Sequence, residues 1–187
     1  MAVKGSSAQG KKSREKGVAF EREMAIAFTS WWGSAVRRMP LSGAYGAEWN
    51  LAGDLMFVTP FPFYVELKKR ENWSLAHLMH EERGPVPGWW RTASAEALLA
   101  GQRPLLIVAR NRREPLVLFR GRDVRDMPCV NKSGLPRLVR RNWVVQGGGA
   151  EDDVQIFQLS VLLAPWTLEA FRALDTLSTQ HRELDFA

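Results

Sequence analysis

The sequence predicts an α/β domain in which a central mixed β-sheet is flanked by helices. Three observations support this class. An apolar stripe with helical spacing lies near the N-terminus, short strand-like runs fill the middle of the chain, and a segment with helical composition stands near its end. Helices that precede and follow a set of strands indicate a sheet covered on both faces.

Length and composition are those of one domain with an extension. The chain has 187 residues, 45% of them hydrophobic, including eight Trp and nine Phe, which is enough for a substantial core. We expect a flexible basic arm over residues 1–12, a core over 13–120, and an extension over 121–187 that packs on the same domain. No internal repeat is visible.

Several features bear on where the protein works. No apolar run reaches the ~18 residues of a membrane span, so we expect no membrane partner. The basic N-terminus lacks the apolar region of a secretory signal. A single cysteine, Cys129, cannot form an internal disulfide, which fits a reducing cytoplasm. We therefore expect a cytoplasmic protein.

The first helix is predicted from Ser13 to Trp32, with Gly33 after its end. Its apolar residues recur at spacings of four, four and three, as Phe20, Met24, Phe28 and Trp31. A short strand is expected in "SAVRRMP", followed by a glycine-containing loop. Two further strands, "DLMFVT" and "FYVELKK", are expected to pair as a hairpin across "PFP".

The second half of the chain continues with helices and then strands. "WSLAHLMHEE" and "WWRTASAEALLA" read as helices separated by the breaker "GPVPG". "RPLLIVAR" and "EPLVLFR" read as strands joined by the basic turn "NRRE". Residues 121–150 read as a loop. "VQIFQLSVLLA" is expected to be a strand that runs into a short element, and "PWTLEAFRALDTLS" a closing helix.

The charge is unevenly distributed. The net charge is +6, but residues 103–142 alone hold eleven basic and three acidic residues, and residues 1–16 hold five basic and one acidic. Such basic segments bind phosphate backbones by releasing counterions. Solvated basic faces that aid solubility are the alternative, and we favour nucleic-acid binding.

Two carboxylates and an amine form the central constellation. Asp54 begins one predicted strand, and Glu66 and Lys68 share one face of the next because side chains alternate along a strand. Leu67 then points into the core. If the two strands pair, Asp54 and Glu66 approach and repel, and a divalent cation such as Mg²⁺ relieves the repulsion. Lys68 could orient a metal-bound water or neutralise charge on a phosphate.

Further residues upstream could join this site. Glu21 is a third carboxylate at the margin of the first helix's buried face and could complete a metal shell. Arg22 beside it could point towards phosphate. Before the strand pair, Arg37, Arg38 and Ser42 could contact the nucleic-acid backbone.

The pattern of Gly53, Asp54, Glu66 and Lys68 resembles the PD-(D/E)xK nuclease signature. "KGVAFERE", residues 16–23, resembles the first-helix motif of archaeal-type (Hjc-like) Holliday junction resolvases. "AVRRMPLSG" resembles their second strand and the loop that leads to the Asp. The resemblance covers about residues 13–120. The insert "HEERGPVPGWW" looks more like the resolvase-like nucleases of bacteriophages.

This resemblance implies a restriction-endonuclease-like core and Mg²⁺-dependent cleavage of branched DNA by paired nicks, with Mn²⁺ as a substitute ion. It implies a homodimer and, for a phage-encoded member, action in the host cytoplasm. The implied metal ligands are Asp54, Glu66, the Leu67 carbonyl and Glu21. The implied catalytic residues are Glu21, Asp54, Glu66, Lys68 and Ser42. The DNA-binding residues we expect are Lys16, Arg22, Arg37, Arg38, Lys69, Arg112 and Arg113.

The sequence departs from that pattern in three places. Gly53 replaces the Pro before the Asp, the loop from Ser42 to Asp54 is longer than in compact resolvases, and residues 121–187 have no named counterpart. Two alternatives remain open: an endonuclease of the same fold that acts on other DNA during replication, recombination or packaging, and a DNA-binding module without catalysis.

Two smaller motifs have ordinary interpretations. His77 and His80 have a spacing that can serve zinc, but without further ligands we expect ordinary helix residues. Trp31 is expected in the core, whereas Trp89 and Trp90 could pack in the core or stack on unpaired bases.

Overall fold

A computed structural model gives the fold of the chain and describes residues 6–39, 53–74, 84–125, 139–144 and 151–184. Its larger sheet has five strands in the order β3-β4-β5-β7-β6. These strands are β3 (Phe63–Lys69), β4 (Arg103–Ala109), β5 (Leu116–Arg120), β6 (Val139–Val144) and β7 (Glu151–Gln158). Only β3 and β4 pair in parallel, and the remaining neighbours are antiparallel. The predicted mixed sheet is confirmed.

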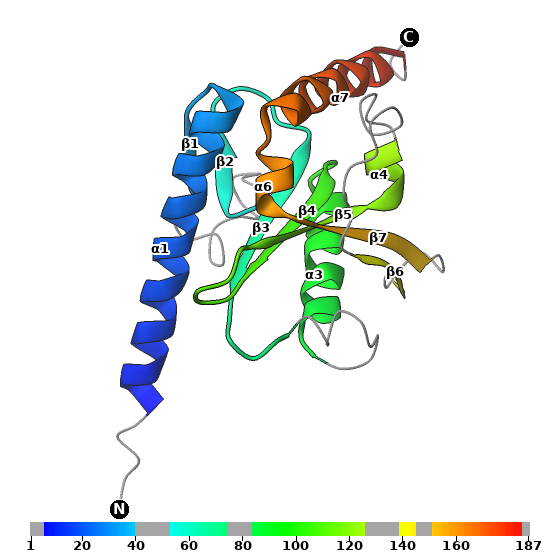
Figure 1. Cartoon of the computed structure of the whole chain (residues 1–187). Helices are drawn as coiled ribbons and strands as arrows, with labels where there is room; N and C mark the ends of the chain where they lie inside the picture. Colours follow the sequence, from blue (N-terminus) through cyan, green and yellow to red (C-terminus); the bar gives the residue numbers. More distant parts are fainter. Residues whose placement is uncertain (1–5, 40–52, 75–83, 126–138, 145–150, 185–187) are drawn as a thin grey trace, which may run out of the picture.

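A second, two-stranded sheet pairs β1 (Val36–Arg38) with β2 (Leu55–Phe57) in antiparallel register. The described helices are α1 (Ser6–Trp32), α3 (Val86–Leu99), α4 (Gly121–Arg125), α6 (Leu159–Leu162) and α7 (Pro165–Leu184). Figure 1 shows α1 along one side of the molecule with β1 and β2 beside its C-terminal half. No helix within the described ranges is long and apolar enough to cross a bilayer.

Two apolar clusters cover the two faces of the five-stranded sheet. Alternation along β4 sends Leu105 and Ile107 into the cluster that includes α1 and α7, and Leu106 and Val108 into the cluster under α3. All four side chains have 0% exposure, as expected of a strand that helices cover on both faces. The predicted helical flanks of the sheet are therefore present.

The predicted stripe of the first helix is buried as expected. Phe20, Met24, Phe28 and Trp31 are each at most 8% exposed. Gly33 follows α1 with a φ of +75° and donates its N–H to Thr29 at 3.1 Å, as a residue after a helix end does. Trp31 lies in the core, as predicted. For Trp89 and Trp90, the structure favours packing in the core. Trp90 is fully buried, and Trp89 is partly buried and packs against the same cluster.

The predicted hairpin between "DLMFVT" and "FYVELKK" is wrong. β2 pairs with β1, and β3 pairs with β4 in the other sheet. The connection is not a tight turn because it carries Phe61 into the core. The Phe61 ring stacks on Phe57 with centroids 3.9 Å apart and also contacts Trp32 and Phe171.

Other boundaries also differ from the sequence prediction. α1 begins at Ser6, so residues 6–12 are helical where we expected part of a flexible arm. α3 begins at Val86, inside the predicted breaker, because Pro is tolerated in the first helical turn. Residues 121–150 contain α4 and β6 rather than loop alone. The helix predicted over "WSLAHLMHEE", with His77 and His80, and the residues Ser42 and Cys129 lie outside the described residues.

The core contribution of α1 can be measured by truncation. Phe28→Ala should lower the free energy of unfolding by about 3–5 kcal/mol, because a fully buried ring is removed and a cavity remains. Ile26 on the same helix is 72% exposed, so Ile26→Ala should change stability by less than about 0.5 kcal/mol. Chemical denaturation of both variants checks this, and similar losses would contradict the assigned buried face.

Candidate active site

Gly53 fixes the approach of Asp54 to β3. Its φ is +86°, and a Cβ built on it would lie 2.6 Å from the Val65 carbonyl oxygen. A side chain would therefore be strained and would collide with backbone. Proline, whose ring holds φ near −65°, could not adopt this conformation. The departure from the PD pattern is thus a requirement of the local backbone.

Asp54 joins the small sheet to the large one through its backbone and its carboxylate. Its N–H donates to the Val65 carbonyl at 2.8 Å, and its Oδ2 accepts the Leu67 N–H at 2.7 Å. Its own carbonyl accepts the Met39 N–H at 2.9 Å. Asp54 therefore takes the place of a neighbouring strand at the outer edge of β3. Its predicted proximity to β3 is real, although no hairpin produces it.

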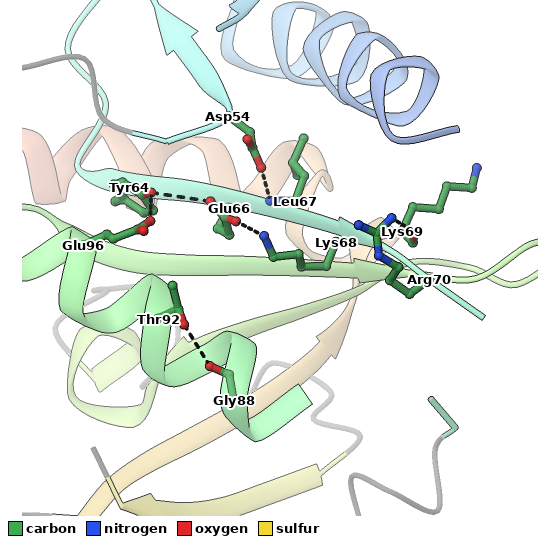
Figure 2. A network of polar contacts seen from close by, with 10 residues as sticks. All are labelled: Asp54, Tyr64, Glu66, Leu67, Lys68, Lys69, Arg70, Gly88, Thr92 and Glu96. Carbon is green, nitrogen blue, oxygen red and sulfur yellow. Dashed lines mark hydrogen bonds and ion pairs between the residues drawn. The ribbon is translucent and has the colours of Figure 1, made fainter. Parts of the chain in front are cut away.

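Glu66 and Lys68 lie on one face of β3, as predicted, and Leu67 is buried in the opposite cluster. Glu66 is 7% exposed. Lys68 Nζ forms an ion pair with Glu66 Oε1. Figure 2 shows these side chains along the strand, with Asp54 at its edge. Alternation along β3 thus places Glu66 and Lys68 on the opposite face of the strand from Leu67.

Burial and charge perturb Glu66 strongly. Burial raises the pKa of the Glu66 carboxyl to about 7, with the nearby Asp54 charge as the second cause, while Lys68 opposes the rise. Burial also raises the pKa of Tyr64, together with its hydrogen bond to Glu96, so Tyr64 remains neutral. Burial and the neighbouring Asp54 charge both disfavour the ionised form of Glu66. A bound cation would stabilise that ionised form against both effects.

The donors at β3 fit a hard divalent cation. Asp54 and Glu66 supply carboxylate oxygens, and the Leu67 carbonyl faces the same strand edge as its N–H, which meets Asp54. Mg²⁺ is commonly bound through one or two carboxylates and keeps several waters. Across the described part of the chain, no three His, Cys, Asp or Glu side chains gather as a metal-binding group.

Glu21 has a different neighbour from the one the sequence suggested. Its Oε2 forms an ion pair with Arg38 Nε, which links α1 to β1. Glu21 is therefore tied to the strand that pairs with β2, rather than grouped with Asp54 and Glu66. Its role as a metal ligand stays a prediction.

The predicted DNA-binding residues lie on several elements. Lys16, Arg22 and Arg37 are exposed on α1 and β1. Lys69 is half-buried, with its Nζ 5.3 Å from the centroid of the Phe20 ring. The exposed residues Arg112 and Arg113 form part of the β4–β5 turn.

That turn lies at the C-terminal end of β3, the strand that carries Glu66 and Lys68. Lys69 is the register partner of Ala109, the last residue of β4. Asn111 in the turn donates its N–H to Glu71 Oε1 at 3.0 Å. The basic turn is therefore held next to the end of β3.

Sequence reasoning missed two polar residues at this site. The Tyr64 hydroxyl donates to Glu96 Oε2 and lies 3.4 Å from Glu66 Oε2. Tyr64 could have been found, because it precedes Glu66 by two positions and must share its face. Glu96 is on α3, and no local pattern relates that helix to β3.

Comparisons with known proteins give the family of the chain. The model of a family described as "Phage putative PDDEXK endonuclease" matches residues 12–139. The chain is 27% identical over 117 residues to Protein D14 of Escherichia phage T5, which covers 59% of this chain and 72% of that protein. Among solved structures it is similar to Hjc, a Holliday junction resolvase of Archaeoglobus fulgidus. That similarity has a TM-score of 0.35 and 15% identity, over 56% of this chain and 76% of that one.

The Gly53 requirement can be tested directly. Gly53→Ala should lower the free energy of unfolding by about 1–3 kcal/mol or more, because the new Cβ meets the Val65 carbonyl at a strained φ. Gly10→Ala is the matched control, since a Cβ there meets nothing within 4 Å. In a helix it should be neutral or stabilise by up to about 1 kcal/mol. Equal stability of both variants would contradict the described backbone.

The burial of Glu66 predicts a pH dependence of metal-free stability. Its pKa rises from 4.5 to about 7 on folding. The protonated carboxyl therefore favours the native state below pH 4.5, and this contribution is lost as pH rises through 7. Glu66→Gln mimics the protonated form at every pH.

The free energy of unfolding of Glu66→Gln relative to wild type should therefore increase by up to about 3 kcal/mol between pH 4.5 and pH 8. Denaturation in the presence of a chelator at pH 4.5, 6 and 8 measures this difference. A constant difference over the range would show that Glu66 is not desolvated.

Proposed function

We propose, since the chain belongs to the phage PD-(D/E)xK endonuclease family, that it hydrolyses DNA phosphodiester bonds with Mg²⁺ at the site on β3. Family membership itself makes the protein a nuclease with DNA as its substrate. The observation that supports the metal site is the placement of the Asp54 carboxylate on the β3 backbone beside buried Glu66.

Asp54, Glu66 and the Leu67 carbonyl are the proposed ligands. When bound, the ion would lower the pKa of a coordinated water and neutralise charge on the phosphate. The protein's part is to hold the two carboxylates at fixed positions. Asp54 is fixed by the Leu67 N–H at 2.7 Å, and Glu66 by its ion pair with Lys68.

Lys68 is the proposed catalytic lysine. The Lys68 side chain is 29% exposed, whereas the side chain of its partner Glu66 is 9% exposed. Lys68 can therefore remain beside Glu66 and also reach solvent and substrate. From that position it can orient the attacking water or donate to a phosphate oxygen as negative charge develops.

The exposed basic residues are proposed to hold the DNA backbone. Lys16, Arg22 and Arg37 approach from the α1 and β1 side, and Arg112 and Arg113 from the β4–β5 turn. β4 pairs along one side of β3, and Asp54, which leads into the β1–β2 sheet, lies along the other side. Contacts of this kind release counterions, so binding should weaken steeply with salt.

The preferred substrate is proposed to be branched DNA such as a four-way junction. Support comes from the "KGVAFERE" segment, which resembles the first-helix motif of Holliday junction resolvases. A four-way junction needs two coordinated cuts, so the active form would be a C2 homodimer working in the host cytoplasm. Ser42 remains a proposed phosphate contact.

Two alternatives are kept. A family member acting on linear or flap DNA would use the same site with a different surface. A binding module without catalysis is disfavoured, because Glu21, Asp54, Glu66 and Lys68 are all present.

The first test is cleavage of a labelled four-way junction in Mg²⁺, with linear duplex and flap DNA in parallel. Asp54→Asn keeps an acceptor for the Leu67 N–H but removes the charge, and should slow cleavage at least about 100-fold. Lys68→Met should slow it about 10²–10⁴-fold. Glu169→Gln changes an exposed residue of α7 and should cut like wild type.

Each substrate pattern has its own meaning. Symmetric cuts in opposing strands of the junction support the resolvase proposal. Equal cutting of duplex would retain the nuclease and discard junction preference. Binding without cutting, in both Mg²⁺ and Mn²⁺, would overturn the proposed chemistry.

A further inference from the structure

Tyr64 connects the proposed metal site to α3. Its hydroxyl donates to Glu96 Oε2 on α3, and its oxygen lies 3.4 Å from Glu66 Oε2. Figure 2 shows Tyr64 between the two carboxylates, with Lys68 on the other side of Glu66. Three side chains of β3 and one of α3 therefore form a continuous row of polar contacts.

Tyr64 has a single hydroxyl hydrogen, and its position determines which carboxylate receives the hydrogen bond. A tyrosine has one O–H donor, and the contact to Glu96 is much the shorter of the two. The hydrogen therefore points to Glu96, and the contact to Glu66 is a weak second branch. Glu96 thus determines how the hydroxyl is oriented beside Glu66.

Both oxygens of Glu66 have a defined neighbour. Oε1 is paired with Lys68 Nζ, and Oε2 faces the Tyr64 hydroxyl. Tyr64 is only 6% exposed, so its ring is held by packing and cannot move aside easily. The Glu66 carboxylate is consequently confined between Tyr64 and Lys68.

Tyr64 and Glu96 differ in their surroundings. Tyr64 is buried, whereas Glu96 is exposed on α3. A buried tyrosine hydroxyl needs a hydrogen-bond partner in any protein, but a neutral acceptor would satisfy it. Here the acceptor is a carboxylate, which also adds negative charge beside a site proposed for a cation.

We propose that Tyr64 and Glu96 are positioning residues for the metal site: Glu96 orients the Tyr64 hydroxyl, and Tyr64 confines the Glu66 carboxylate to the position from which it binds the ion. This inference rests on the proposed metal-dependent nuclease. Partners behind a ligand carboxylate typically change metal affinity about 10–100-fold when removed. Because Glu96 is exposed, its charge alone contributes less, since salt screens it.

The experiment uses the full chain and two measurements. Calorimetric titration with Mn²⁺ gives metal affinity without DNA, and cleavage over a range of Mg²⁺ concentrations gives the half-saturating concentration and the maximal rate. The variants are Tyr64→Phe, Glu96→Ala, Glu96→Gln, the double variant Tyr64→Phe/Glu96→Ala, and Glu169→Gln as a charge-matched control on α7. Thermal unfolding checks that each variant folds.

Tyr64→Phe should weaken Mn²⁺ binding and raise the half-saturating Mg²⁺ about 10–100-fold, while the maximal rate changes little. Glu96→Ala should act in the same direction, and Glu96→Gln, which keeps an acceptor, should recover most of the loss. The double variant should be no worse than Tyr64→Phe, because Glu96 acts through Tyr64. Glu169→Gln should match wild type.

Other outcomes would overturn the inference. Unchanged metal affinity in Tyr64→Phe, even with lower stability, would leave Tyr64 a structural residue only. Additive losses in the double variant would show that Glu96 acts independently of Tyr64. If wild type binds Mn²⁺ but cuts no DNA, the proposed function fails while the affinity series still tests the positioning pair. If wild type binds no Mn²⁺, both fail.

Discussion

The arrangement of the site depends on the hydrogen bonds that hold Asp54 against the backbone of β3. The carboxylate accepts the Leu67 N–H and the main chain donates to Val65, so residue 54 occupies an edge that a further strand would otherwise use. Gly53 makes this possible because no side chain could stand so close to the Val65 carbonyl. Asp54 also accepts the Met39 N–H through its carbonyl, which holds the end of β1 next to it.

Apolar burial elsewhere in the fold offsets the free-energy cost of burying the Asp54 and Glu66 carboxylates. Asp54 and Glu66 are at most 8% exposed, and desolvating two neighbouring carboxylates is unfavourable. Opposite them, α1 and α7 bury an aromatic cluster that includes Phe28, Phe61 and Phe171 against the sheet. Large apolar burial on that face can offset the cost of charges held on the other.

Local patterns predicted much of this, and non-local contacts account for the errors. A period of two placed Glu66 and Lys68 together, and a period near 3.6 identified the buried stripe of α1. The approach of Asp54 to β3 was predicted for the wrong reason, since β2 pairs with β1 and not with β3. Glu96 lies 30 positions from Glu66 in the sequence, and no periodicity spans that interval.

The charges around Glu66 support the proposal of a divalent ion at this site. Arg38 neutralises Glu21, and Lys68 is paired with Glu66. The Asp54 charge still raises the pKa of the Glu66 carboxyl, although Lys68 opposes the rise. The proposed Mg²⁺ would relieve this repulsion. Because Glu21 is paired with Arg38 and is not grouped with Asp54 and Glu66, the proposed ion would have two carboxylate ligands at β3, a number that Mg²⁺ commonly takes.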